Sequence, residues 1–141
     1  FKDLAVSLGV SDYVKFVGKF ADPNKVREQL CSADIYLFPS EAEGLPRGVI
    51  EAMACGLVCV ASNVSGIPEL LEGKDMYDPK DVDGYVNRLA ELMDNTDEMA
   101  KLSSRNIDVA RNYSTKNLTK SRDKFYRNLR NLVEKVKNNE Y

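Results

Sequence analysis

The stretch "FPSEAEGLPRGVIEAMACGLVCVAS", from Phe38 to Ser62, decides what kind of fold this chain can form. It begins in the last residues of an apolar strand at residues 34–40 and ends with a second apolar strand at residues 57–62. The residues between them, 46–56, have the pattern of a helix, and Gly56 takes the position just past its end. Because parallel strands need a crossover connection, this order predicts a parallel pair joined by a helix.

The same alternation of strands and helices continues on both sides of this stretch. The sequence predicts helices at residues 1–10, 22–33, 81–95, 97–113 and 114–138, and strands at 13–18 and 75–78. Two of the strands are almost entirely apolar, which is typical of a parallel sheet covered on both faces. We therefore expect an α/β, Rossmann-like parallel sheet with helices on both faces, ending in helices. In this sheet, residues 13–18, 35–39 and 57–61 should be parallel neighbours.

The bulk composition excludes several classes of protein. The chain has 141 residues, enough for one domain with its own core. Its net charge of −2 argues against nucleic acid as a partner. No apolar run approaches the roughly 20 residues needed to cross a bilayer, and the first ten residues have the pattern of an amphipathic helix rather than a signal peptide. We expect a cytoplasmic protein.

The three cysteines and the absence of histidine limit the chemistry further. Cys31, Cys55 and Cys59 are an odd, scattered set in apolar surroundings, which predicts reduced and mostly buried thiols. Without histidine, a metal site would need Cys and carboxylate ligands at spacings that do not occur, so no metal and no cofactor are expected. The chain also cannot form a Ser–His or Cys–His nucleophile pair.

The loop and helix after the first apolar strand form the candidate site. Ligands of open parallel sheets bind outside the carboxyl ends of the strands. The first N–H groups of the helix, at Arg47–Ile50, would attract a phosphate there, and Gly44 and Gly48 would let it approach the backbone. Glu43 and Glu51 could then accept hydrogen bonds from sugar hydroxyls on either side. Both glutamates could equally be solvated surface acids.

The stretch "PSEAEGLPRGVIEAMACGLVCVASNVSGIPELL" resembles the donor-site signature of the family four retaining glycosyltransferases, which have the GT-B fold. The matching elements are Pro39-Ser40, Glu43-Gly44, Glu51-Ala52-Met53-Ala54, Gly56, Ala61-Ser62 and Gly66-Ile67-Pro68-Glu69. Flanking segments agree with the family: "VKFVG" resembles its strand before the base-binding turn, "SADIYLFPS" its next strand and "YSTKNLTKSRDKFYRNL" its final helix. The resemblance covers nearly the whole chain.

This resemblance implies a hexosyltransferase that uses a nucleotide-diphosphate sugar, without a metal, in polysaccharide biosynthesis. Glu43 would be the catalytic residue facing the transferred sugar, and Glu51 would bind the ribose hydroxyls. The other donor-binding positions implied are Gly44, Leu45, Arg47, Gly48 and Val49 at the sugar and diphosphate, and Gly18, Lys19 and Phe20 at the base. The hexose would pass, with retention, to a glycan, lipid-linked or other acceptor.

The sequence departs from the family pattern at several places. Leu45-Pro46 stands where the family often has a small or aromatic pair, and Ser65 replaces the first of a common glycine pair. Arg47 adds a cation that would contact a phosphate, contact the acceptor, or remain solvated. The family's basic pair for the diphosphate and its acceptor-binding domain would lie upstream of Phe1. Residues 1–141 are thus expected to be part of a C-terminal donor domain, inactive alone.

Two other functions remain open at this point. The chain could belong to a nucleotide-sugar epimerase or a donor-binding subunit of the same fold, or it could be a Rossmann-like interaction domain without a ligand. The signature from Glu43 to Glu51 favours the transferase.

The C-terminal segment, residues 116–137, is strongly basic and has apolar residues at helical spacing. This pattern has two interpretations. The helix could pack on its own domain or on the acceptor domain, or it could contact an anionic membrane surface peripherally, at the inner face of the membrane.

Overall fold

The computed structural model describes residues 1–137 of the chain. Short 3-10 turns, labelled η, occur among the helices and strands. The elements in chain order are α1 (Lys2–Ser7), η1 (Ser11–Tyr13), α2 (Pro23–Cys31), β1 (Ile35–Phe38), α3 (Arg47–Ala54), β2 (Val58–Ser62), η2 (Ile67–Glu69), η3 (Gly73–Asp75), β3 (Met76–Tyr77), α4 (Val82–Met93), α5 (Thr96–Asn112) and α6 (Thr115–Lys137).

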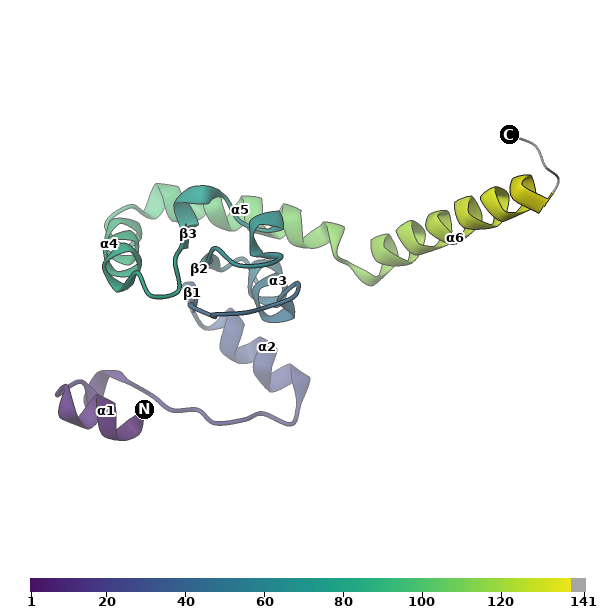
Figure 1. Ribbon diagram of the computed structural model, residues 1–141. Coiled ribbons are helices and arrows are strands. Elements are labelled where there is room, and N and C mark those ends of the chain that lie inside the picture. The colour runs from purple at the N-terminus through teal and green to yellow at the C-terminus, as the bar shows by residue number, and fades with distance from the viewer. Residues whose placement is uncertain (138–141) are drawn as a thin grey trace.

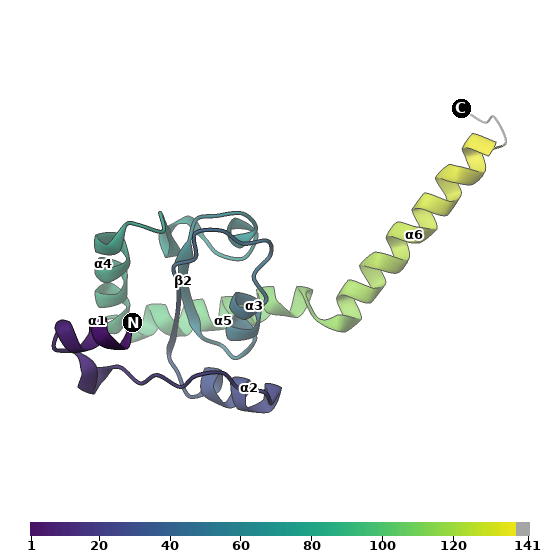
Figure 2. The same cartoon turned by 60° about the horizontal axis from the view of Figure 1, so that its bottom comes forward.

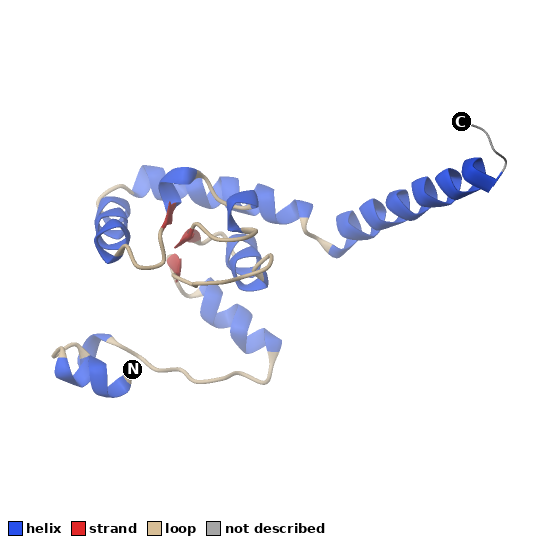
Figure 3. Ribbon diagram, viewed as in Figure 1, coloured by secondary structure: helices blue, strands red, loops and turns tan. Residues whose placement is uncertain are grey.

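The three strands form one parallel sheet in the order β1-β2-β3. In this register Leu37 lies opposite Val60, and Ser62 lies opposite Tyr77. The sheet lies in the middle of the body between α3 and α4, and α5 runs across one end of it (Figures 1 and 3). This arrangement confirms the predicted α/β fold with a parallel sheet and helices on both faces.

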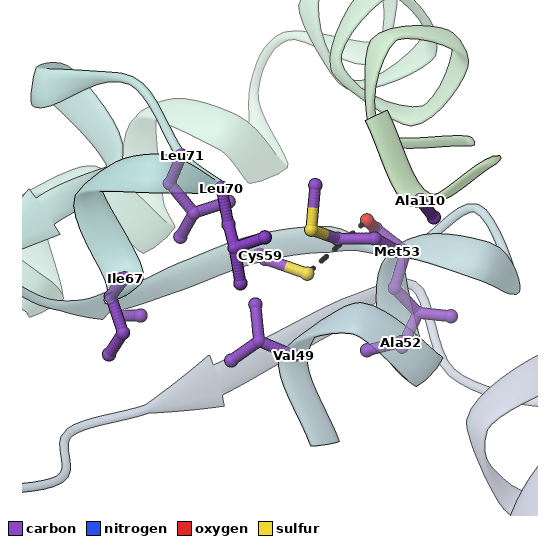
Figure 4. Packing of buried hydrophobic residues seen from close by; sticks show 10 residues of the cluster. Val49, Ala52, Met53, Cys59, Ile67, Leu70, Leu71 and Ala110 are labelled. Carbon is purple, nitrogen blue, oxygen red and sulfur yellow. Dashed lines mark hydrogen bonds between the residues drawn. The ribbon is translucent and has the colours of Figure 1, made fainter. Parts of the chain in front are cut away.

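The central strand β2 is buried along its whole length, and its two faces meet different helices. Cys59 and Ala61 belong to a core cluster with Val49 and Met53 of α3. Figure 4 shows these α3 side chains against Cys59, with Ile67, Leu70 and Leu71 at one end of the cluster. Each such buried aliphatic side chain contributes about 1.5–3 kcal/mol relative to an exposed one.

The opposite face of β2 packs against α4 and α5. Val58 and Val60 form a second cluster with Tyr85 and Leu92 of α4 and with Leu102 of α5. Alternate residues of a strand point to opposite faces, so a continuous apolar run is what a strand covered on both sides requires.

The turn between α3 and β2 is fixed by α5. Gly56 follows the helix with φ +81°, a left-handed conformation that suits the predicted position past the helix end. A Cβ at Gly56 would come within 3.1 Å of Ser103 Oγ. Asn106 Nδ2 donates to the carbonyl of Leu57 at 2.8 Å. Helix α5 therefore packs closely on this turn and satisfies a buried backbone acceptor.

The prediction of a strand at residues 13–18 is wrong. Its start belongs to the 3-10 turn η1, and the sheet of the described residues contains only β1, β2 and β3. Val14, Phe16 and Val17 remain 40–46% exposed. The apolar alternation is present, but a strand also needs a neighbour that satisfies its N–H and C=O groups. This segment forms no ladder with the free edge of β1.

A buried ion cluster joins η3, α4 and α5, and the sequence did not predict it. Arg88 is 3% exposed, and its Nε donates to Asp75 Oδ1 at 2.9 Å. Its two terminal nitrogens donate to Glu91 at 2.6 Å and to Glu98 at 2.7 Å. Hydrogen bonds from Arg88 and Lys74 lower the pKa of Glu98 to about 2. The cluster gives the buried guanidinium a partner for each nitrogen.

The two ends of the described chain extend from this body. Helix α1 lies apart from it at the end of an extended segment, and α6 projects as a separate rod from the end of α5 (Figures 1 and 2). Among residues 1–137, no helix has the length and apolar character required to cross a bilayer.

Candidate functional site

The loop between β1 and α3 lies at the carboxyl end of the sheet and is held by hydrogen bonds from Ser40, Ser62 and Gly66. Ser62 Oγ donates to the carbonyl of Ser40. Ser40 Oγ donates to Glu43 Oε1 at 2.7 Å. The N–H of Gly66 donates to the carbonyl of Gly44 at 3.0 Å. The end of β2 and the turn after it thus fix both the loop and the half-buried Glu43 carboxylate.

The contact at Gly66 leaves no room for a side chain. A Cβ there would lie 2.8 Å from the carbonyl oxygen of Gly44 and 3.2 Å from Leu45 Cα. The preceding residue, Ser65, has φ +50°, a left-handed conformation that is uncommon for a residue with a Cβ. The two loops therefore meet backbone to backbone.

Helix α3 begins without a side-chain cap, because its N-cap residue is Pro46. The N–H of Ile50 donates to the carbonyl of Pro46 at 3.3 Å, so it is not free, contrary to the expectation from the sequence. The N–H groups of Arg47, Gly48 and Val49 precede the first intrahelical bond. They carry the positive end of the helix dipole and suit an anion.

The second glutamate, Glu51, lies one turn into α3. Arg47 Nη2 lies 3.3 Å from Glu51 Oε1, with side chains 89% and 49% exposed. Such exposed i,i+4 pairs stabilise a helix by only about 0.3–0.5 kcal/mol. Both side chains are therefore available to a ligand at little cost in stability.

A tyrosine that the sequence did not single out, Tyr36, lies near both glutamates. A Cβ on Gly48 would come within 2.8 Å of the Tyr36 hydroxyl, which places this hydroxyl at the first turn of α3. Burial raises the pKa of the Tyr36 phenol, and electrostatic repulsion from the nearby Cys59, Glu51 and Glu43 groups in their ionised forms raises it further. The ring stacks on Phe38, two positions along β1, with centroids 5.8 Å apart.

This tyrosine could have been noticed from the period of the strand. Residues two apart on a strand share a face, so Tyr36 and Phe38 point to the side of the sheet on which the following helix packs. What the sequence could not indicate is that the hydroxyl ends beside Gly48.

A cavity of about 490 Å³ opens between α2 and α3. Such a volume lies within the usual range for small-ligand sites. One wall is formed by the segment around α2, and the other by the exposed side of α3. The lining residues are Phe20, Ala21, Pro23, Val26, Arg27 and Leu30 on the first wall, and Arg47, Glu51, Ala54 and Cys55 on the second.

The cavity unites part of the predicted site. Phe20, Arg47 and Glu51 line it together, although Phe20 lies 31 positions before Glu51. Gly18 and Lys19 lie in the exposed segment that leads to Phe20 and do not line the cavity.

The remaining predicted positions lie around the start of α3 rather than in the cavity. Glu43, Gly44 and Leu45 belong to the loop, and Gly48 belongs to the first turn of the helix. Val49 is fully buried in the core, so only its backbone can serve a ligand.

The lining residues that the sequence did not predict come mainly from α2. Val26, Arg27 and Leu30 follow the helix start that Asp22 caps, where its side chain accepts from the N–H of Asn24 at 2.9 Å. Their spacing of one and four positions is that of a helix face, but the pattern alone does not tell a cavity wall from a core contact.

The three cysteines are free thiols in different surroundings. Cys59 is buried, Cys55 is half-buried and Cys31 is exposed, so the expectation of mostly buried thiols is wrong for Cys31. Burial, together with the nearby Cys31, raises the pKa of Cys55 to about 11, and burial raises the pKa of Cys59 to about 12. Both thiols are protonated at neutral pH and are poor nucleophiles.

Comparison with known proteins shows the family of the chain. A model described as glycosyl transferases group 1 matches residues 1–95. The chain belongs to this family. An uncharacterized glycosyltransferase of Haemophilus influenzae is 34% identical over 116 residues, which cover 79% of this chain and 32% of that protein. The chain thus spans about a third of the length of this curated relative.

Two solved structures have the same fold, and the first is from a group 1 family glycosyltransferase. The C-terminal domain of LpcC from Francisella tularensis superposes with a TM-score of 0.73 at 21% identity, covering 81% of this chain and 60% of that one. HepE of Anabaena, solved in complex with UDP, superposes with a TM-score of 0.69 at 26% identity, covering 77% and 30%. The predicted resemblance to the C-terminal domain of a GT-B glycosyltransferase is confirmed.

Metal binding is a separate matter. In the part of the chain that the structure describes, no group of three or more His, Cys, Asp or Glu side chains could hold a metal ion.

Proposed function

We propose that this chain is the donor-binding part of a hexosyltransferase that takes the hexose from a nucleotide-diphosphate sugar and transfers it with retention. The observation that carries the proposal is the joint position of two features. A cavity is lined by Phe20, by Glu51 and by Arg47, the first residue of α3, and three N–H groups at this start of the helix precede the first helical bond. Beyond that helix start, the loop holds Glu43 through Ser40.

The parts of such a donor match these features in order. The diphosphate binds at the N–H groups of Arg47, Gly48 and Val49, because a helix N-terminus favours anions. The Arg47 guanidinium lies at the same end of the helix. Because its ion pair with Glu51 is exposed, Arg47 can break that pair and bind the phosphate instead. The ribose hydroxyls donate to the Glu51 carboxylate, and the base enters the cavity beside Phe20.

The transferred hexose lies on the other side of the diphosphate, along Glu43, Gly44 and Leu45. As the bond from the anomeric carbon to the diphosphate breaks, its electron pair leaves with the phosphate oxygen and positive charge develops on the sugar. The Glu43 carboxylate, oriented by Ser40, stabilises this charge more than it stabilises the neutral donor.

The acceptor and the setting of the reaction are part of the same proposal. Because the chain spans a third of its relative, residues outside it would bind the glycan, lipid-linked or other acceptor in a pathway of polysaccharide biosynthesis. We expect the chain alone to bind donor without turnover. Free thiols at the three cysteines suit a reducing compartment, so we place the reaction in the cytoplasm. The proposed chemistry uses no metal.

The test uses the full-length protein with a set of radiolabelled uridine and guanosine diphosphate hexoses and candidate acceptors. The expected result is labelled product whose anomeric configuration, read by NMR, equals that of the donor. An inverted product would contradict retention. An epimerised donor without transfer would favour an epimerase of the same fold instead.

A further inference from the structure

Helices α2 and α3 run in the same direction along the two walls of the cavity. Helix α2 ends at Cys31, shortly before β1 begins, so it runs toward the amino end of the sheet. Helix α3 follows β1, so it starts at the carboxyl end of the sheet and also runs toward the amino end. Residues equally far from the two helix starts can therefore lie opposite each other across the cavity.

Two cysteines establish this correspondence at the far ends of the helices. Cys31 lies eight positions after Pro23, the first residue of α2, and Cys55 lies eight positions after Arg47, the first residue of α3. The two side chains are neighbours, because the pKa of Cys55 is raised first by burial and next by a hydrogen bond with Cys31.

By the same count, Arg27 of α2 lies level with Glu51 of α3. Each is four positions after the first residue of its helix, and both line the cavity. Both also act on the thiol of Cys55, one turn further on. Against the larger effect of burial, the positive charge of Arg27 lowers the pKa of Cys55, and the negative charge of Glu51 raises it. Arg27 and Glu51 thus lie on opposite walls at the middle of the cavity.

Arg27 differs from every other lining residue on its wall. The others, among the residues that the structure describes, have apolar side chains, which can contact the flat face of a ligand but offer no hydrogen bond. On this wall the guanidinium of Arg27 is therefore the side-chain group that can contact the polar edge of a ligand. It has N–H donors and no acceptor, so it binds only acceptor atoms.

We propose that Arg27 selects the base of the donor, by donating a hydrogen bond to O4 of uracil or O6 of guanine. The inference rests on the proposed function, in which the diphosphate lies at the start of α3 and the ribose hydroxyls bind Glu51. The base attached to that ribose then extends across the cavity to the α2 wall, where Arg27 lies level with Glu51.

The chemistry of the bases gives this contact its selectivity. Cytosine and adenine carry an amino group where uracil and guanine carry O4 and O6. The N–H groups of that amino group meet the donors of Arg27 without an acceptor between them. A site that hydrogen-bonds one group rejects an analogue that leaves its polar atoms unpaired. The preferred donors are therefore uridine and guanosine diphosphate hexoses, rather than cytidine or adenosine ones.

The experiment is calorimetric titration of the full-length protein with UDP, CDP, GDP and ADP. In each pair, UDP with CDP and GDP with ADP, the bases differ at the carbonyl or amino group. At least one of UDP and GDP should bind, at least about tenfold more tightly than its amino counterpart, as expected for one hydrogen bond to a charged group. Equal affinities within the pair that binds would overturn the selection by Arg27 and leave the donor site intact. Absence of binding by all four nucleotides would contradict the proposed function itself, and with it this inference.

Two matched variants test Arg27 directly. Arg27→Met and Lys25→Met each remove one positive charge from α2, but Lys25 does not line the cavity. Arg27→Met should bring the affinity ratio within the pair close to one, whereas Lys25→Met should leave the ratio unchanged. Because the ratio compares two nucleotides on the same variant, a change in the folded fraction cancels. An equal loss of affinity for both nucleotides in Arg27→Met would contradict the proposal, since Arg27 would then act on the phosphates or on the position of α2.

Discussion

The α3 wall of the cavity rests on the buried core, whereas the α2 wall rests on side chains that are only partly buried. Val49, Ala52 and Met53 of α3 are fully buried, but no residue of α2 is. Leu30 of α2 packs on the edge of the same core cluster and remains half-buried. The groups proposed for diphosphate and ribose are therefore held by the fold, and those proposed for the base are held more weakly.

The largest expected effect is the difference in stability between the two walls. Met53→Ala should lower the free energy of unfolding by about 2–5 kcal/mol, because it leaves a cavity in the core. Leu30→Ala should cost only about 1 kcal/mol, because part of its side chain is already in water. Chemical denaturation of both variants measures this. Similar losses would remove the distinction between the walls.

The next effect concerns catalysis on the α3 side. Glu43→Gln in the full-length enzyme should lower kcat about 10²- to 10³-fold, as expected for a lost electrostatic contact of about 3–4 kcal/mol. The matched control is Glu41→Gln, since Glu41 lies in the same loop but is exposed. If only KM changed in Glu43→Gln, Glu43 would bind sugar without a catalytic part.

A smaller effect tests how the loop is held. Gly66→Ala should lower the free energy of unfolding by about 1–3 kcal/mol and weaken donor binding, because the new Cβ meets the backbone of Gly44 and Leu45, which cannot rotate away. Gly73→Ala is the control, since a Cβ there meets nothing within 4 Å. The account of the loop contact would fail if both variants behaved alike.

These regions also differ in how far the sequence predicted them. The elements around β1, α3 and β2 were predicted because their signals are local: two apolar runs, a helix pattern and a glycine at the helix end. The strand at residues 13–18 was predicted on the same kind of signal and is absent, because pairing depends on a neighbour that local pattern does not specify. The ion cluster around Arg88 was not predicted for a similar reason: it joins residues from three elements, and the local sequence pattern does not specify how those elements pack together.

The residues of the candidate site also divide into those that were predicted from the sequence and those that were not. The resemblance to a family, rather than periodicity, related Phe20 to Arg47 and Glu51, and the cavity brings these three together. Tyr36 was not found because its position depends on how α3 packs on β1, and the α2 side chains were not found because theirs depends on how α2 packs on α3. A helix face toward a cavity has the same spacing as one toward a core.

The most direct test of the central claim is calorimetric titration of the full-length protein with uridine and guanosine diphosphate. One of them should bind, and Glu51→Gln should weaken that binding about tenfold, as expected for the loss of a charged hydrogen bond of about 1.5 kcal/mol. Glu28→Gln, which removes an exposed acid of α2 outside the cavity lining, should leave the affinity unchanged. The claim that this cavity and the start of α3 form a donor site would be contradicted if neither nucleotide bound. It would also be contradicted if Glu51→Gln bound the nucleotide with the same affinity as the unaltered protein.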